Sequence, residues 1–442
     1  METIYGIAEN LWTGKTTTYT HHPFGPPYGL EKVCDGVYFF KGFANTIVLE
    51  TDAGLVIVDP AGMVDVTMKY PAIRKVLQAP LHTAIFTHGH VDHVFGVDDY
   101  AAENARNGTA PPRVVAHRLL PERLRRYIRT AGWNSALNSR QFRGGVEKVA
   151  WPTRYWWPDL LYEGALDFTV GDQPIQVRHC RGETDDHSWV FFPSQKVLCT
   201  GDLFIYAVPN AGNPQKVQRF AGEWADGLKR MAALAPEYLL PGHGFPIVGR
   251  ERVAEALLNT ARLLEHLDSE TVRLMNEGAD LDRILNAVAV PPDLADLPYL
   301  QPVYDESEFI VRNIYRLYGA WYDGQPSHLK PAPQREQANV VAELAGGVSL
   351  VMEKALSCSR DGNHRLACQL ADWAVLAAPE DDAVRSAAGR IYLDRALQEP
   401  STMAMGIFLA EAARLGAQLP EGHLAAGRII MAQCERGPFQ KI

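Results

Sequence analysis

One stretch of the chain, Thr87-His88-Gly89-His90-Val91-Asp92-His93, holds three histidines and one aspartate within six residues. It directly follows the apolar run 83–86, which is typical of a buried strand. On a loop just past that strand, His88 and His90 point the same way, while Asp92 and His93 turn toward a second point nearby. Packing gives little reason for four such side chains, whereas imidazole and carboxylate groups are common zinc ligands. The stretch therefore predicts two neighbouring metal ions.

A site with two metal ions needs more ligands than this stretch supplies. Three isolated candidates lie downstream, namely Glu183, Asp202 and His243. Each lies in a turn that contains glycine and follows an apolar run, and functional side chains gather in such turns of layered folds. The sequence therefore nominates these three side chains as further metal ligands.

Short runs with strand character alternate with helical periodicity through the first part of the chain. Strands are predicted at 37–40, 45–50, 55–59, 83–86, 113–117, 175–179, 188–192 and 196–199, and helices at 65–78, after Gly96, at 119–131 and at 221–234. This alternation predicts a layered α/β domain. Residues 1–30 are predicted to form an N-terminal arm. Residues 133–163 are predicted to be a loop rich in Trp and Tyr, either lining an apolar pocket or packing as a lid.

Helical periodicity replaces the strand pattern beyond about residue 250. Helices are predicted at 252–276, 306–323, 336–358, 363–377, 381–396 and 402–415, with a proline-rich connector at 324–334. The pair 363–377 and 381–396 resembles one tetratricopeptide-like hairpin, which cannot bury both of its faces by itself. We expect it to pack on neighbouring helices or on a second subunit.

Composition and charge exclude several classes of partner. The formal net charge is −9 and no long basic run occurs, which argues against a nucleic-acid partner. No apolar run approaches the length of a membrane span, and residues 1–30 lack the pattern of a signal peptide. The six cysteines form no C-x-x-C pair and are predicted to be reduced. These features predict a cytoplasmic protein.

The motifs together resemble those of the metallo-β-lactamase-fold hydrolases over about residues 30–260. They are H-x-H-x-D-H at 88–93, Gly182-Glu183-Thr184, Gly201-Asp202 and Pro241-Gly242-His243-Gly244. The resemblance implies an αββα sandwich with two Zn²⁺ ions, or other divalent metals, at the shared edge of its sheets. The implied ligands are His88, His90 and Glu183 for the first metal, Asp92, His93 and His243 for the second, and Asp202 as the bridge.

Glu183 narrows the resemblance further. Most of the superfamily has a histidine at this position, whereas bacterial alkylsulfatases of this fold have a glutamate. The stretch 312–329 is also similar to the dimerisation domain of those enzymes, in a match that covers about residues 300–420. The resemblance predicts a homodimer and three segments. They are an N-terminal arm at 1–30, a metallo-β-lactamase-like catalytic domain at 31–265 and a helical dimerisation domain at 266–442.

Some features depart from the alkylsulfatase pattern. Those enzymes usually carry Glu where Asp202 stands, and their third, sterol-carrier-like domain is missing from these 442 residues. Their sulfate-binding segment places an arginine where this chain has Gln215, so Arg219 or Lys216 is expected to substitute. The expected substrate-binding residues are Asn210, Tyr206 and Arg219.

Three functions follow from this pattern. The leading hypothesis is an alkylsulfatase-like zinc hydrolase that cleaves a sulfate ester or related ester of a small molecule with a metal-bound hydroxide, which Asp92 orients. A hydrolase of the same fold that acts on a lactone, thioester or phosphodiester is the alternative, because a metal pair activates water without choosing the bond. The third hypothesis is a protein without hydrolytic activity, either a metal-binding scaffold or a redox iron site.

Overall fold

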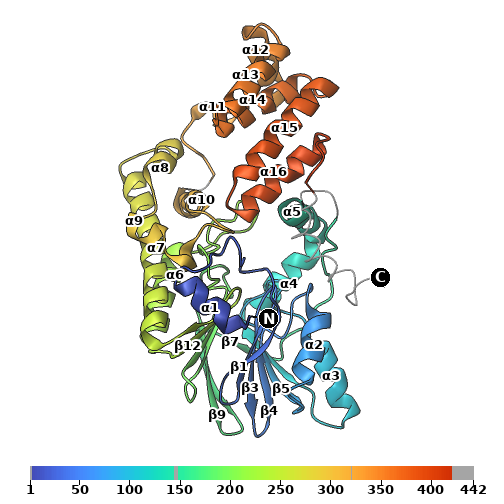
Figure 1. Cartoon of the computed structure of the whole chain (residues 1–442), viewed down its shortest axis with the longest axis vertical. Coiled ribbons are helices and arrows are strands. Elements are labelled where there is room, and N and C mark those ends of the chain that lie inside the picture. Colours follow the sequence, from blue (N-terminus) through green and yellow to red (C-terminus); the bar gives the residue numbers. More distant parts are fainter. Residues whose placement is uncertain (1, 144–147, 320, 421–442) are drawn as a thin grey trace. The chain divides into compact units, whose positions relative to one another are not determined.

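The computed structural model describes residues 2–143, 148–319 and 321–420 (Figure 1). These residues divide into two compact units. The first contains residues 2–131 and 152–319, and the second contains 132–143, 148–151 and 321–420. No helix among the described residues is long and apolar enough to span a membrane.

Two β-sheets form the centre of the first unit. In spatial order, the first sheet contains β1 (Gly29–Cys34), β2 (Val37–Lys41), β3 (Thr46–Thr51), β4 (Gly54–Val58), β5 (Leu81–Ile85), β6 (Arg113–His117) and β7 (Leu160–Tyr162). The second contains β13 (Ile247–Val248), β12 (Tyr238–Pro241), β11 (Val197–Gly201), β10 (Ser188–Phe192), β9 (Gln173–His179) and β8 (Ala165–Val170). Strands β4 to β7 pair in parallel, as do β11 and β12. Parallel pairing places the carboxyl ends of neighbouring strands at one edge of each sheet.

Side chains of β4 point alternately to two hydrophobic cores, as the period of a strand requires. Val56 and Val58 belong to the core that the two sheets share. Leu55 and Ile57 belong to a second core with the helices α2 (Val66–Arg74), α3 (Val97–Arg106) and α4 (Leu120–Arg129). Helices of the shared core are α6 (Ala221–Ala232), α7 (Arg250–Asn276), α8 (Leu281–Ala287) and α10 (Ser307–Gly319). Two sheets covered by helices confirm the predicted αββα sandwich.

The second unit is helical. Its elements are α5 (Ala131–Arg143), which begins at the boundary, α11 (Pro326–Leu329), α12 (Gln334–Leu344), α13 (Val348–Arg360), α14 (His364–Ala377), α15 (Asp382–Gln398) and α16 (Thr402–Arg414). The predicted hairpin is present as α14 and α15, and Asp381 caps α15 by accepting from the backbone N–H groups of Ala383 and Val384. Small side chains such as Ala371 and Ala388 fill the core of this unit. The predicted segments 1–30, 31–265 and 266–442 stay a prediction.

Two sequence predictions about helices are wrong. The single helix expected at 336–358 is interrupted between α12 and α13, because Gly346 and Gly347 have φ angles of +86° and +131°. Such angles suit glycine and end a right-handed helix. The loop expected at 133–163 begins as helix α5. Its sequence lacks an apolar stripe, and the helix packs closely on α16, since a Cβ atom at Gly406 would lie 1.8 Å from the carbonyl oxygen of Gln141.

The expected N-terminal arm also contains a helix, α1 (Ile4–Trp12). Ile4, Ile7, Ala8 and Leu11 have helical spacing and are buried in the core that the two sheets share. The sequence therefore carried the signal for this helix. Thr3 caps it by accepting a hydrogen bond from the N–H of Gly6.

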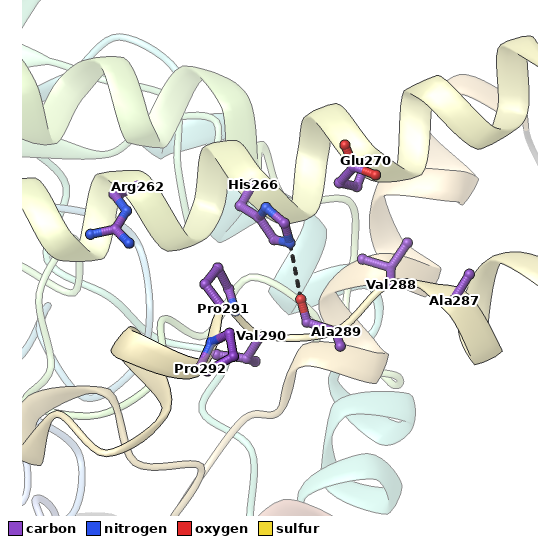
Figure 2. A pocket seen from close by; sticks show the side chains of 9 residues that line it. All are labelled: Arg262, His266, Glu270, Ala287, Val288, Ala289, Val290, Pro291 and Pro292. Atoms are coloured by element: carbon purple, nitrogen blue, oxygen red, sulfur yellow. Dashed lines mark hydrogen bonds between the residues drawn. The ribbon is translucent and has the colours of Figure 1, made fainter.

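A pocket of about 530 Å³ lies between α7 and the segment 287–292 (Figure 2). His266 of α7 donates from Nε2 to the carbonyl oxygen of Ala289, at 3.0 Å, on one side of this pocket. None of the residues that the sequence nominates for metal or substrate lines it. The nominated residues lie elsewhere, after the ends of strands in both sheets.

Candidate metal centre

The nominated ligands follow strands of both sheets. The His88–His93 stretch follows β5, Glu183 lies in the turn between β9 and β10, Asp202 follows β11, and His243 follows β12. Two backbone hydrogen bonds join the sheets at this edge. The N–H of Ser188 donates to the carbonyl oxygen of Thr87, and the N–H of Asn45 donates to that of Gly242, both at 2.7 Å. The fold thus brings together side chains that are far apart in sequence.

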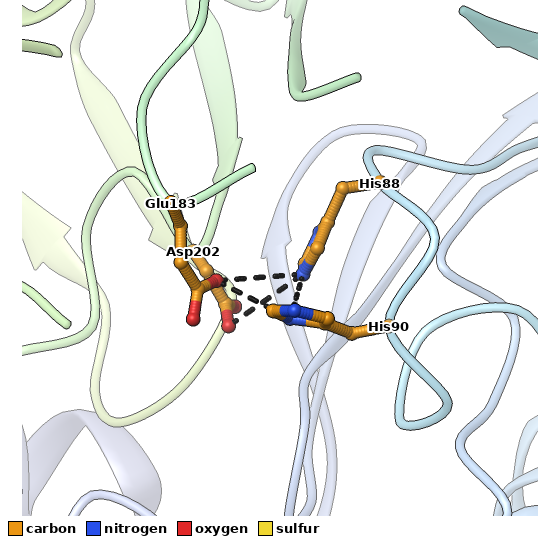
Figure 3. Close-up of side chains that lie close together, drawn as sticks. All are labelled: His88, His90, Glu183 and Asp202. Carbon is orange, nitrogen blue, oxygen red and sulfur yellow. Dashed lines mark hydrogen bonds and ion pairs between the residues drawn. The ribbon is translucent and has the colours of Figure 1, made fainter. Parts of the chain in front are cut away.

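The first group contains His88, His90, Glu183 and Asp202 (Figure 3). One ligand atom from each side chain lies within 4.8 Å of the others. Nε2 of His88 lies 2.8 Å from Nδ1 of His90, and each of these atoms lies 3.5 Å from Oε2 of Glu183. Two nitrogen atoms and a carboxylate oxygen therefore face one point.

The second group contains Asp92, His93 and His243. Oδ2 of Asp92 lies 3.3 Å from Nε2 of His243 and 3.6 Å from Nε2 of His93. Asp202 contacts both groups: its carboxylate lies 3.2 Å from His93 and from His243, and 3.8 Å from His88. This position suits a bridge between two ions, which was the role predicted for Asp202.

Asp59, which the sequence prediction missed, orients two of these histidines. It accepts hydrogen bonds from Nδ1 of His93 at 2.8 Å and from the hydroxyl of Thr87 at 2.7 Å. The Thr87 hydroxyl in turn accepts from Nδ1 of His88 at 3.0 Å. Both rings therefore carry their proton on Nδ1 and present Nε2 to the carboxylates, an arrangement common around metal-binding histidines. A lone acid directly after β4 was the available signal.

His243 is oriented by the backbone. Its Nδ1 donates to the carbonyl oxygen of Phe43 at 2.5 Å, which leaves Nε2 facing Asp92 and Asp202. Asn45 donates from its side chain to two carbonyl oxygens of the turn that carries His243. This turn approaches the acid so closely that a Cβ atom at Gly242 would lie 2.1 Å from Oδ1 of Asp202. The turn therefore requires glycine at this position.

The buried carboxylates of the site give it a negative charge that favours the binding of cations. Burial raises the pKa of Asp202, but the neighbouring His243 and His93 outweigh it and hold that pKa well below its usual range. Burial lowers the pKa of His243, but Asp202 and Asp92 raise it to about 9. Among the nominated ligands, three buried atoms make no hydrogen bond within the described residues: Nε2 of His93, Oε2 of Glu183 and Oδ1 of Asp202. A mixed nitrogen and oxygen set of this kind fits zinc and other divalent metals.

The second oxygen of Glu183 is held by two residues that were predicted to bind substrate. Oε1 accepts from Nδ2 of Asn210 and from Nη1 of Arg219, each at 2.5 Å. Burial raises the pKa of Glu183, but His90 and Arg219 lower it to about 2. Arg219 therefore balances the charge that glutamate adds to a position where a neutral histidine is usual.

The substrate-binding roles of Asn210, Arg219 and Tyr206 stay predictions. Nε of Arg219 and Oδ1 of Asn210 have no hydrogen-bond partner among the described residues. The ring of Tyr206 packs 6.3 to 6.4 Å from those of Phe204, Phe245 and Tyr299. Its described ring contacts are thus with aromatic side chains rather than with the nominated metal ligands.

A buried ion pair between Asp186 and Arg123 holds the backbone of the His88–His93 stretch. Oδ2 of Asp186 accepts from the N–H of Gly89 at 2.9 Å, and Oδ1 accepts from Nε of Arg123 at 2.7 Å. His187 stacks on His88 with 4.2 Å between ring centroids. The sequence prediction missed the role of Asp186, although two acids directly after the Glu183 turn were visible.

Comparisons with known families agree with this geometry. The model of the metallo-beta-lactamase superfamily matches residues 40–243, and the model of alkyl sulfatase dimerisation matches residues 280–418. A linear primary-alkylsulfatase from Pseudomonas sp. (strain ATCC 19151) is 27% identical over 365 residues, which cover 78% of this chain and 69% of that protein. An (R)-specific secondary-alkylsulfatase from Pseudomonas sp. is 24% identical and is covered over 58% of its length.

A solved structure has the same fold. The stereoselective inverting sec-alkylsulfatase Pisa1 from Pseudomonas sp. superposes with a TM-score of 0.81 at 22% identity, covering 89% of this chain and 66% of that one. The chain therefore carries a metallo-β-lactamase superfamily domain over residues 40–243 and is similar to hydrolases of that superfamily. Within that class it resembles the alkylsulfatases, in both its catalytic part and its helical part.

Proposed function

We propose that the chain hydrolyses a sulfate ester of a small organic molecule at a centre of two Zn²⁺ ions. The observation that carries the proposal is the position of Glu183, which faces His88 and His90 with one oxygen and is held by Arg219 through the other. The named activities of the relatives, which are primary and secondary alkylsulfatases, support the same class of substrate.

Seven side chains would hold the metals: His88, His90 and Glu183 the first, Asp92, His93 and His243 the second, with Asp202 between them. Bound metals would supply an activated water molecule and positive charge for the developing anion. Asp92 would orient the water, because its carboxylate lies between His93 and His243. The side chains of Asp92 and His90 are 21% and 18% exposed, whereas those of the other five are at most 5% exposed. Substrate would therefore enter past Asp92 and His90.

The remaining parts of the proposal concern assembly and location. We propose a homodimer formed through the helical part of the chain, which matches the alkyl sulfatase dimerisation family over residues 280–418. A cytoplasmic location is proposed from the reduced state expected of the cysteines.

The full-length chain loaded with Zn²⁺ tests the activity. Elemental analysis is expected to find about two zinc ions per chain, and ion chromatography is expected to detect sulfate released from primary or secondary alkyl sulfates. Asp202→Asn is expected to abolish release, whereas Asp35→Asn, at an exposed site, retains it. The same protein is offered a lactone, a thioester and a phosphodiester.

Turnover of one of those compounds without any sulfate release would replace the sulfatase by another hydrolase of the same fold. Binding of two zinc ions without turnover of any ester would favour the scaffold. One zinc ion or none would remove the bridged centre itself.

A further inference from the structure

Residues 22–25 form a short segment, here called the arm turn, that lies against a nominated metal ligand. The ring of Phe24 contacts that of His243 edge to face, with 4.4 Å between centroids and 67° between planes. The ring of Phe43 contacts the same imidazole at 5.6 Å and 81°. His243 thus has an aromatic ring on two sides, in addition to its hydrogen bond to the backbone of Phe43.

Lys41, at the end of β2, fixes the arm turn. This lysine is fully buried, and its Nζ donates to the carbonyl oxygens of Pro23 at 3.1 Å and Gly25 at 2.5 Å. These carbonyls flank Phe24 on both sides in the chain. The oxygen of Pro23 also accepts from the N–H of Gly244 at 3.1 Å. The same carbonyl therefore joins the arm turn to the turn that carries His243.

Two further contacts hold the arm turn from the side of the loop before α10. Nε2 of His22 donates to the carbonyl oxygen of Val303 at 3.1 Å. Burial keeps this imidazole neutral by lowering its pKa to about 4. The ring of Tyr304 contacts Phe24 with 4.6 Å between centroids. Phe24 is consequently held in place by Lys41 of β2, by the turn that carries His243 and by the loop before α10.

We infer that Phe24 is a positioning residue for His243 and that Lys41 holds Phe24 in place. The single hydrogen bond at Nδ1 fixes one atom of the imidazole but leaves the ring free to tilt about it. Phe24 fills the space into which the ring would tilt, so Nε2 stays directed at Asp92 and Asp202. Residues that orient a ligand from outside typically change metal affinity by about 10- to 100-fold. The inference rests on the proposed function, because His243 as a metal ligand is part of that proposal.

Zinc titration of the full-length chain against a competing chromophoric chelator tests this inference. Phe24→Ala is expected to weaken one of the two zinc equivalents by about tenfold and to leave the other unchanged. The unchanged equivalent belongs to His88, His90 and Glu183. Phe24→Leu, which keeps most of the apolar volume, is expected to give a smaller loss. Lys41→Met is expected to weaken the same equivalent and to speed deuterium uptake at residues 22–25.

The matched control is Tyr19→Ala, which removes an aromatic ring that is 54% exposed in the same part of the chain. It is expected to bind both zinc equivalents as the unchanged protein does. Wild-type affinity for both equivalents in Phe24→Ala would overturn the inference, and so would equal weakening of both, which indicates a general loss of folding. The titration uses no substrate. A selective loss in a chain that releases no sulfate would therefore refute the proposed activity and support the role of Phe24.

Discussion

Arg219 and Glu183 form a buried ion pair, with Nη1 2.5 Å from Oε1 and both side chains at most 2% exposed. The pair explains how a glutamate replaces the usual histidine in this site. A third carboxylate beside Asp92 and Asp202 would otherwise add uncompensated negative charge. The arginine neutralises the charge of Glu183 and also fixes which of its oxygens faces His88 and His90.

Glu183→Gln should therefore destabilise the metal-free protein, because it leaves the guanidinium of Arg219 buried without a counter-charge. Breaking a buried pair in this way costs about 3–5 kcal/mol of unfolding free energy, which urea denaturation measures. Glu163→Gln breaks the exposed pair with Arg118 and should cost less than about 1 kcal/mol. Similar small losses in both variants would show that the buried pair contributes little.

Asp59→Asn should weaken metal binding about 10- to 100-fold, although residue 59 is not itself a nominated ligand. The amide group cannot accept from both Nδ1 of His93 and the hydroxyl of Thr87 while it also accepts from the Thr87 N–H. Chelator competition measures the change. Asp167→Asn, at an exposed ion pair, serves as the control. Unchanged affinity in Asp59→Asn would mean that the tautomer of His93 is fixed by other groups.

Lys41 should make stability depend on pH in the alkaline range. Burial lowers its pKa from 10.5 to about 7, so the folded chain releases this proton at a lower pH than the unfolded chain. Between about pH 7 and 10.5 the unfolded state binds more protons, and the free energy of unfolding should rise with pH. The difference between the unchanged protein and Lys41→Met isolates this effect. A difference that stays constant or falls across that range would contradict the assignment.

Arg123→Met should destabilise the protein by leaving the buried carboxylate of Asp186 without its charge partner. Arg123→Met alone should lose about 3–5 kcal/mol of unfolding free energy. The double variant Arg123→Met with Asp186→Asn removes both charges and should lose less unfolding free energy than the single variant. Urea denaturation of the set gives the coupling energy. Glu122→Gln, in an exposed pair with Arg125, provides the reference. If the double variant were less stable than Arg123→Met, lost side-chain packing rather than the unpaired charge of Asp186 would explain the destabilisation.

The sequence indicated a layered α/β domain and its candidate ligands because both signals are local, whereas the αββα sandwich and the grouping of the ligands were implied by the family resemblance. His88, His90, Asp92 and His93 are almost contiguous, and the remaining candidates lie in short turns after strands. The groups that orient them depend on strand pairing and could not be derived in the same way. Asp59 reaches Thr87 across 28 residues, and Phe43 reaches His243 across 200.

Helix α5 and the arm turn show a second reason why prediction fails. The helix contains the buried polar residues Asn134 and Gln141, and its sequence has no apolar stripe from which a helix could be predicted. Its close approach to Gly406 depends on a helix more than 250 residues later in the chain. Likewise, nothing near Phe24 in the sequence indicates that Lys41 turns inward to meet it. Such contacts arise only once distant elements are packed.

The origin of the nominated ligands in both sheets has a consequence for the lifetime of the protein. Without metal, the edge where the sheets meet gathers Asp92, Glu183 and Asp202; Arg219 balances the charge of Glu183, and histidine protons offset the charges of the other two. Metal ions bound there would link the two sheets, because their ligands come from both. Binding to the folded state alone raises the stability of that state by mass action. The supply of metal during synthesis would then influence how much of the chain survives proteolysis.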